Sequence, residues 1–278
     1  MDLIKNNTYS ASALQTFLDC ERKYELLYIK EIKWPALKYE PYKEIEEKMI
    51  RGQRFHHLIH QHHLGIDTDT LKEIALNMEI DNWWNNYIDF FNRQSNIKFK
   101  WSEINLTIPF GKNTLLTARY DLITLEEEKF FTIFDWKTSE NRSPDKYILN
   151  RIQTKLYPLV LCETGFLNIT DKLQIDPDMI KMVYWFANFP RNPFTISYST
   201  NDYKNDKRYI RSLIDQIESK ADGSFNKTSN INFCSYCNYR SLCDRGIKAI
   251  NINQVKNDQH HNENIFEIDL DSIGEIEY

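Results

Sequence analysis

The sequence lacks an apolar run long enough to cross a bilayer, and its first residues show none of the architecture of a secretion signal. It also lacks the even set of cysteines that marks a small secreted framework, because it has five. These absences predict a soluble cytoplasmic protein with no membrane partner. A chain of 278 residues is long enough to bury one sizeable core, with room for an appended subdomain.

Positive charge is not in excess either, because the net charge is −5. The deficit lies at the end of the chain, where seven acids but no lysine or arginine follow Lys256. Without these seven, 33 of the 40 acids face 35 bases, so the body is nearly neutral. That balance permits a local basic groove for nucleic acid without demonstrating one. We expect residues 247–278 to form an acidic, flexible tail that docks on a partner, mimics DNA in a groove or stays solvated.

A strand is predicted over residues 129–137, and it carries Asp135 and Lys137 near its end. Residues two apart in a strand project to the same face, so the carboxylate and the ammonium should stand side by side. Phe134 and Trp136 should then point to the opposite face. One interpretation is chemical, in which the carboxylate holds a divalent metal and the ammonium orients water or stabilises charge developing on a phosphate. The alternative is a surface ion pair at the end of a strand.

Helical and strand-like patterns alternate along the chain, which predicts an α/β fold. Asp121 lies in an otherwise apolar strand, and antiparallel pairing can bring it close to Asp135. Two carboxylates about 4 Å apart repel by roughly 4 kcal/mol at an effective dielectric of about 20, and a divalent cation between them reverses the sign. Helices are predicted over 10–30, 43–64, 67–95, 145–164 and 203–220, and strands over 99–110, 114–125, 129–137, 180–187 and 194–199.

The second predicted helix contains Gly52, four residues before His56, and a glycine there allows close approach of another chain or a ligand. The same helix places His56, His60 and His63 on one face, which leaves a zinc site open beside simple solvation. Aromatic residues along 67–95 are interpreted as core packing rather than as a platform for stacking bases.

Gln153 and Tyr157 lie one turn apart on the predicted helix 145–164. Both are hydrogen-bonding residues on an otherwise apolar helix, which makes them candidates for a polar site. Cys162 on the same helix is interpreted as a plain core residue.

Three thiols stand close together near the end of the body, in a C-x2-C-x5-C cluster formed by Cys234, Cys237 and Cys243. Metal binding is the default interpretation of such spacing in a cytosolic protein. Three ligands leave a four-ligand site one short, and Cys20 and Cys162 are the only thiols left to complete it.

In chain order, these motifs resemble the PD-(D/E)XK nuclease superfamily in its RecB-like branch. The matching motifs are Gly52-x3-His56, Asp121, Asp135-x-Lys137 and Gln153-x3-Tyr157. An early Cys20 combined with the late C-x2-C-x5-C is similar to the iron–sulfur subtype of that branch, which includes the CRISPR-associated RecB-type exonucleases. The resemblance covers residues 10–245 approximately.

The resemblance implies a role for each matching residue. The catalytic positions correspond to Asp121, Asp135, Lys137, Gln153 and Tyr157, with Lys137 as the catalytic lysine and the last two orienting that lysine or the DNA. A Mg²⁺ or Mn²⁺ ion would be bound by His56, Asp121 and Asp135. A 4Fe–4S cluster, with zinc as the alternative, would be bound by Cys20, Cys234, Cys237 and Cys243.

The resemblance also implies a restriction-endonuclease-like core, with a mixed β-sheet flanked by helices. It predicts a single nuclease domain over 1–246, with the core at 99–200, a helical part at 43–98 and a metal-cluster subdomain that joins Cys20 to 230–246. The implied function is a metal-dependent nuclease, an exonuclease on single-stranded DNA, in repair, recombination or CRISPR adaptation. A helicase or an adaptation protein would bind the acidic tail. The alternative is a non-catalytic DNA-binding or scaffold subunit of a helicase–nuclease complex.

Two residues near Asp121 depart from the family pattern. The family usually has Gly where Ala118 stands, and often has Pro where Tyr120 stands. Neither change removes a ligand, so activity is expected to survive, although the methyl group of Ala118 crowds the substrate.

Overall fold

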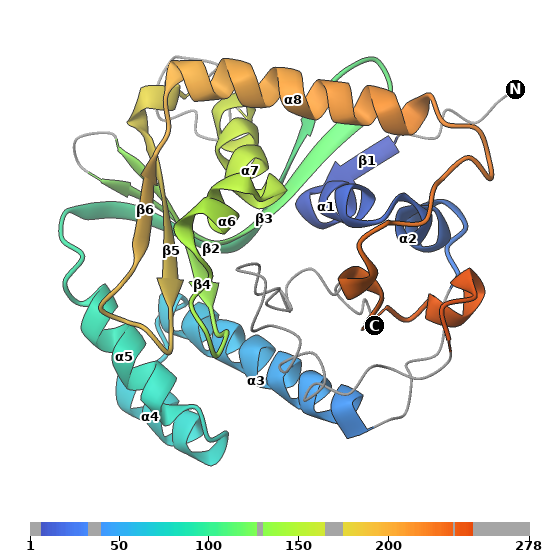
Figure 1. The fold of residues 1–278 in the computed structure, drawn as a ribbon. Helices are drawn as coiled ribbons and strands as arrows, with labels where there is room; N and C mark the ends of the chain where they lie inside the picture. The colour runs from blue at the N-terminus through green and yellow to red at the C-terminus, as the bar shows by residue number, and fades with distance from the viewer. Residues whose placement is uncertain (1–6, 33–39, 127–129, 165–174, 236, 247–278) are drawn as a thin grey trace, which may run out of the picture. The chain divides into compact units, whose positions relative to one another are not determined.

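The computed structural model describes residues 7–32, 40–126, 130–164, 175–235 and 237–246 (Figure 1). The predicted tail 247–278 therefore lies outside the described residues. The chain divides into two compact units. The first unit comprises Met1–Ala11 and Ile50–Ser212, and the second comprises Ser12–Met49 and Leu213–Tyr278.

The first unit is built on a six-stranded mixed sheet (Figure 1). Its strands are β1 (Asn7–Ser10), β2 (Ile97–Pro109), β3 (Thr114–Glu126), β4 (Phe131–Lys137), β5 (Ile180–Phe186) and β6 (Phe194–Ser197). The strand order is β1-β3-β4-β5-β6, with β2 on the other edge of β3. β1 is parallel to β3 and β4 is parallel to β5, whereas the remaining pairs are antiparallel. The predicted α/β fold with a mixed sheet is confirmed.

The first unit also contains helical segments that flank this sheet. They are α3 (Glu40–His63), which belongs to this unit from Ile50 onward, α4 (Thr68–Asn77), α5 (Asp81–Phe91), α6 (Asp145–Asn150), α7 (Ile152–Glu163) and the first part of α8 (Thr200–Glu218). The predicted helix 145–164 is interrupted at Arg151, which has an extended backbone. No helix in the described ranges is long and apolar enough to cross a membrane.

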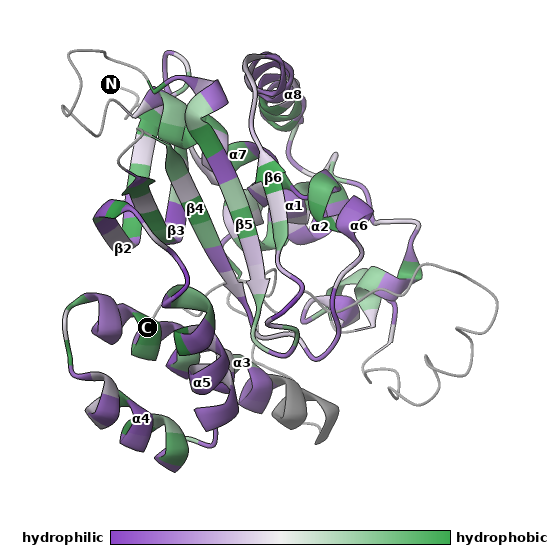
Figure 2. Cartoon of the chain, turned by 90° about the vertical axis from the view of Figure 1, so that its left-hand side faces the viewer, coloured by the Kyte–Doolittle hydropathy of each residue, from purple (hydrophilic) through white to green (hydrophobic). Residues whose placement is uncertain are grey.

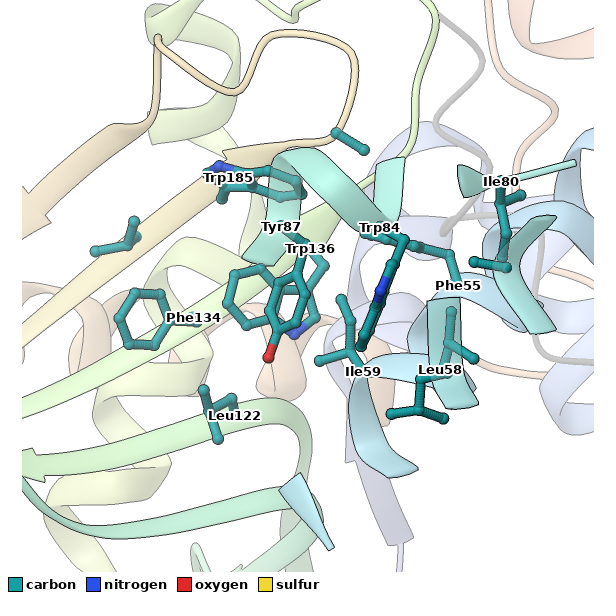
Figure 3. Packing of buried hydrophobic residues seen from close by; sticks show 14 residues of the cluster. Phe55, Leu58, Ile59, Ile80, Trp84, Tyr87, Leu122, Phe134, Trp136 and Trp185 are labelled. Atoms are coloured by element: carbon teal, nitrogen blue, oxygen red, sulfur yellow. The ribbon is translucent and has the colours of Figure 1, made fainter. Parts of the chain in front are cut away.

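An aromatic core joins one face of the sheet to α3, α4 and α5 (Figure 3). Trp84 and Tyr87 of α5 pack with Phe55 of α3 against Trp136 and Trp185 of the sheet. All five side chains are at most 1% exposed. The prediction that the aromatic residues of 67–95 form core rather than a stacking platform is therefore confirmed for these side chains.

Three histidines at the end of α3 form hydrogen bonds with residues of α5 and β2. His62 Nδ1 lies 2.9 Å from the Tyr87 hydroxyl, and His63 Nε2 lies 3.1 Å from the same hydroxyl. His60 Nδ1 lies 3.0 Å from the Ser102 hydroxyl on β2. Because these described histidines bond to hydroxyl groups on α5 and β2, the zinc alternative on this helix face is not borne out.

Acidification is expected to destabilise the first unit through His63. Burial, assisted by the positive charge of Lys100, lowers the pKa of His63 to about 3, whereas an imidazole in an unfolded chain titrates near 6.5. Between those values only the unfolded state binds the proton, so stability that is present above pH 6.5 is lost as the pH falls. The free energy of unfolding should fall by about 2 kcal/mol between pH 7 and pH 5.

Urea denaturation at several pH values measures this effect. His63→Gln should flatten the dependence, while substitution of the exposed His57 on the same helix should leave it unchanged. Identical slopes for the wild type and His63→Gln would contradict the assignment.

The second unit contains the short helices α1 (Ala11–Asp19) and α2 (Glu21–Tyr24), a π-helical turn (Glu25–Ile29) and two 3₁₀ turns (Ile231–Cys234 and Arg240–Cys243). The predicted continuous helix over 10–30 is wrong. Ser10 belongs to β1 (Asn7–Ser10), and the helix is interrupted at Cys20, whose backbone is extended. The Cys20 sulfur accepts a hydrogen bond from the backbone N–H of Lys23 at 3.4 Å, so it caps the start of α2.

Candidate active site

Asp135 and Lys137 lie side by side at the end of β4, as period-two alternation predicts. Lys137 Nζ is 2.9 Å from Asp135 Oδ2, and both side chains are largely buried. Phe134 and Trp136 point into the aromatic core on the other face (Figure 3). A pair held this far from water is not a surface ion pair, because the sheet and α7 fix both groups in place.

Gln153, in the first turn of α7, bonds both members of this pair. Its Oε1 accepts a hydrogen bond from Lys137 Nζ at 3.4 Å, and its Nε2 donates to Asp135 Oδ1 at 2.5 Å. The amide therefore fixes the direction of the ammonium and of the carboxylate together. We call Asp135, Lys137 and Gln153 the lysine triad.

Tyr157 lies one turn after Gln153 and packs behind the lysine triad. Burial, together with the negative charges of Asp135 and Asp121, raises the pKa of Tyr157 well above its usual range, so the phenol stays protonated. The Tyr120 ring lies 4.9 Å from the Tyr157 ring, and the Tyr120 hydroxyl donates to the Tyr157 carbonyl at 2.8 Å. Tyr120, which stands where the family often has Pro, thus ties β3 to α7.

Asp121 lies where β3 and β4 separate. The pairing of these strands ends with Leu122 opposite Phe134, so that Asp121 and Asp135 face each other at the next position. There the backbone N–H of Trp136 donates to Asp121 Oδ2 at 2.8 Å instead of to a strand carbonyl. Beyond this point β4 continues along β5. The register therefore brings the two carboxylates to one fork in the sheet.

Glu103 on β2 is a site residue that sequence reasoning missed. On either side of it, Ser102 pairs with Leu122 and Ile104 pairs with Tyr120, so Glu103 lies opposite Asp121. Its backbone is left-handed, with φ of 52°, which is uncommon for a non-glycine residue in a strand.

The two strands change faces at this position. Tyr120 bonds to α7, whereas Leu122, two residues later, packs against the α3–α5 core (Figure 3). Ser102 of β2, which pairs with Leu122, also faces this core, because its hydroxyl bonds to a histidine of α3. A regular strand would put Tyr120 and Leu122 on the same face. The face change lets Asp121 meet a side chain from α3 as well as the backbone of β4.

His56 of α3 reaches Asp121 at this fork. His56 Nδ1 is 3.3 Å from Asp121 Oδ1, and one ligand atom each from His56, Glu103 and Asp121 lie within 4.8 Å of one another. We call these three residues the metal-ligand group. The structure thus gathers two of the three predicted metal ligands, places Asp135 on the neighbouring strand against Lys137, and adds Glu103.

The electrostatics of the metal-ligand group fit a divalent cation. Burial, and then repulsion from Asp121, raise the pKa of Glu103, while Arg119 opposes this by placing Nε and Nη2 both 3.1 Å from Glu103 Oε2. A cation between the two carboxylates would offset both the cost of burying the charged Glu103 and its repulsion from Asp121. Two carboxylates and one imidazole form a donor set suited to Mn²⁺ as well as Mg²⁺.

Gly52 explains how α3 comes close enough to contribute His56. A Cβ atom built on Gly52 would lie 2.9 Å from the hydroxyl of Thr138, the residue that follows Lys137. Side chains do not tolerate such a contact, so the helix approaches the end of β4 only because residue 52 has no side chain. The glycine therefore serves close packing of this chain's own strand, four residues before His56.

The second unit brings the four predicted cluster thiols near one another. Burial raises the pKa of Cys237, and the neighbouring Cys20 and Cys243 thiols raise it further. Burial likewise raises the pKa of Cys243, with additional effects of Cys20 and Cys234. Such thiols resist ionisation on their own, and a bound metal supplies the positive charge that deprotonates them.

Basic and N–H groups surround these sulfurs. Arg245 Nη1 lies 2.9 Å from Cys234 Sγ, in addition to the backbone N–H of Lys23 at Cys20. These donors suit thiolate ligands. Cys162 instead lies in α7 of the first unit, where burial raises its pKa to about 12, as expected for a core thiol. Cys20, rather than Cys162, is therefore the thiol grouped with the C-x2-C-x5-C cluster.

Comparisons with known proteins identify one family. The model of the PD-(D/E)XK nuclease superfamily matches residues 8–244. No curated protein matches the chain. Among solved structures, the chain is similar to a candidate exonuclease from Eubacterium rectale, at 9% identity and a TM-score of 0.49, over 90% of this chain and 93% of that chain. It is also similar to SSO0001, at 16% identity and a TM-score of 0.37, over 87% of this chain and 88% of that one. Because these structural likenesses are distant, the assignment rests on the family model.

Proposed function

Because this chain belongs to the PD-(D/E)XK nuclease superfamily, we propose that it is a metal-dependent exonuclease that hydrolyses single-stranded DNA. The observation that carries the proposal is the fork between β3 and β4, where the lysine triad and the metal-ligand group meet around Asp121 and Asp135. A nuclease needs a cation site and a positive group close to one phosphodiester, and the fork offers both.

His56, Glu103 and Asp121 are the residues we assign to a divalent cation, with Asp135 as a further ligand from the neighbouring strand. A Mg²⁺ or Mn²⁺ ion held there would polarise the scissile phosphate and lower the pKa of a bound water. Arg119 holds Glu103 in place through Oε2.

Lys137 is the group we assign to the reacting phosphate. Its ammonium can position the attacking water or stabilise negative charge that develops on the phosphate. Asp135 and Gln153 hold the lysine in one direction, and the protonated Tyr157 hydroxyl bonds to Gln153.

Replacement of Glu103 by Gln is expected to weaken Mn²⁺ binding by at least about 10-fold, because it removes one of two carboxylates from the metal-ligand group. His56→Ala should weaken binding similarly. Isothermal titration of Mn²⁺ measures both effects without any DNA present.

Glu126→Gln is the matched control for this titration. Glu126 also lies on the sheet and pairs with a lysine, at 2.8 Å from Lys181, but it is outside the metal-ligand group. Its substitution should leave Mn²⁺ affinity unchanged. Unaltered Mn²⁺ binding by Glu103→Gln would remove Glu103 from the ligand set.

The four grouped thiols are assigned to a 4Fe–4S cluster, with zinc as the alternative. Four sulfurs at 2.3 Å from one zinc ion are about 3.8 Å apart. The C-x2-C-x5-C spacing by itself favours zinc, and the resemblance to the iron–sulfur subtype is what favours the cluster. Iron and sulfide analysis of anaerobically purified protein distinguishes the two metals.

Such an exonuclease fits DNA repair, recombination or CRISPR adaptation, and the acidic segment 247–278 is the part we assign to a helicase or an adaptation-protein partner. Linear and circular single-stranded DNA separate the modes of attack. An exonuclease degrades only the linear form, and cleavage of the circle would make the protein an endonuclease.

A further inference from the structure

Two aromatic rings, one exposed and one half-buried, lie on the strand that supplies Glu103. Phe99 and Trp101 stack on each other, with centroids 6.0 Å apart and planes inclined by 25°. Phe99 is 42% exposed, in contrast to the buried aromatic core. β2, which carries both, pairs only with β3 among the described strands (Figure 2). Phe99 therefore leaves much of its ring surface to solvent at this sheet edge.

A β-bulge brings positive charge to these rings. Ile97 pairs with Glu126 and Phe99 pairs with Leu125, so Lys98 is an extra residue in β2. Bulges redirect side chains, and here the Lys98 ammonium lies 5.6 Å from the centre of the Phe99 ring. Lys100, between the two aromatic residues in the sequence, projects to the opposite face of the strand, where its charge acts on His62 and His63 of α3. The edge therefore combines two π-surfaces with one cation, Lys98.

The aromatic pair is close to the fork. Trp101 is two residues from Glu103 and Phe99 is four, which corresponds to roughly 7 Å and 13 Å along a strand. A nucleic-acid strand with its phosphate at the metal-ligand group would pass this edge within a few nucleotides.

We propose that Phe99 and Trp101 form a platform on which bases of single-stranded DNA stack, with Lys98 on an adjoining phosphate. The platform rests on the proposed function, since its occupant is the strand being cut. Unpaired bases are the fitting ligand because they expose their faces, and a lysine beside the aromatic rings can bind the phosphate next to a stacked base. In a duplex those faces are already stacked, so the platform selects single strands.

Fluorescence anisotropy with a labelled single-stranded oligonucleotide tests this platform in the Lys137→Ala background, in which the DNA stays intact. Phe99→Ala and Trp101→Ala should each weaken binding between about 5-fold and 100-fold. Phe99→Leu keeps apolar bulk but removes the ring, and should show a comparable loss. Trp101→Phe keeps a ring and should retain most of the affinity.

Tyr209→Ala is the matched control. Tyr209 is also 42% exposed and also has a lysine over its ring, with Lys155 Nζ at 5.9 Å, but it lies on α8 rather than on β2. Its substitution should leave binding unchanged. The parent protein, which carries Lys137→Ala and an intact platform, should also bind weakly to an oligonucleotide with abasic sites near its unlabelled end. Its affinity for that oligonucleotide should match the affinity of Phe99→Leu for normal DNA.

Three results would overturn the platform. The first is that Phe99→Leu binds normal DNA as tightly as its parent does. The second is that the parent binds normal and abasic DNA with equal affinity. The third is unchanged DNA binding with loss of self-association in sedimentation, which would make this edge an interface between copies. If the wild type cuts DNA but the platform variants bind normally, only the platform fails. If the wild type neither binds Mn²⁺ nor cuts, the proposed function fails.

Discussion

Replacement of Lys137 by Ala is expected to reduce DNA cleavage by at least about 100-fold while Mn²⁺ binding persists. The ammonium lies 2.9 Å from the buried Asp135 and 3.4 Å from the half-buried Gln153, so these two groups fix its direction. Its loss removes the positive group that acts on the phosphate but leaves His56, Glu103 and Asp121 in place. Rates of nucleotide release under single-turnover conditions, beside Mn²⁺ titrations, separate these two effects.

Lys181→Ala controls for the general loss of a sheet lysine. Lys181 stands on β5 and pairs with Glu126 at 2.8 Å, outside the lysine triad, so its substitution should leave the rate within about two-fold of wild type. Gln153→Ala should lower the rate less than Lys137→Ala, because the lysine remains but loses its orientation. Cleavage by folded Lys137→Ala at the wild-type rate would contradict a catalytic role for this lysine.

The second large effect concerns the cysteine group. Replacement of Cys20 by Ser is expected to destabilise the second unit by several kcal/mol, with an upper figure of roughly 5 kcal/mol. Cys20 and Cys234 are 214 positions apart (from 20 to 234), and the metal group that we propose would close that whole loop in the unfolded chain. The loss is comparable to the stability of a typical domain, so part of the protein should unfold. Thermal denaturation and iron content of anaerobically purified protein measure the effect.

Cys162→Ala is the control for this series. Cys162 is also buried, but it packs in α7 of the first unit, so its substitution should leave the metal content unchanged and cost far less stability. Limited proteolysis of Cys20→Ser should cut within Ser12–Met49 and after Leu213, while Ile50–Ser212 stays protected. A Cys20→Ser protein with wild-type melting temperature and metal content would contradict the cross-linking role.

The fork could be predicted from local sequence because strand alternation is a strong rule. Asp135 and Lys137 share a face whenever β4 is a strand, and the apolar residues around Asp121 mark the neighbouring strand. Glu103 was accessible by the same logic, since folding 99–110 onto 114–125 about the intervening turn pairs it with Asp121. The left-handed backbone of Glu103 could not be predicted, because glutamate is not a residue that favours a positive φ.

Other sequence-based predictions were wrong where contacts between distant segments override the local residue pattern. The apolar spacing over 10–30 suggests one helix, but pairing of residues 7–10 with β3 and capping by the Cys20 sulfur divide it. The polar face of α3 suggests solvated histidines, yet His62 and His63 share the buried Tyr87 hydroxyl. Partners distant in sequence decide both cases, and local periodicity carries no information about them.

Degradation of end-labelled single-stranded DNA by anaerobically purified wild-type protein is the most direct measurement of metal-dependent nuclease activity. It should be run with Mg²⁺, with Mn²⁺ and with EDTA, and the visible spectrum should be recorded on the same sample. We predict cleavage with either cation, none with EDTA, and a broad absorption band towards the blue from a brown sample. Intact, folded protein that cuts with neither cation would contradict the nuclease assignment and leave a DNA-binding subunit.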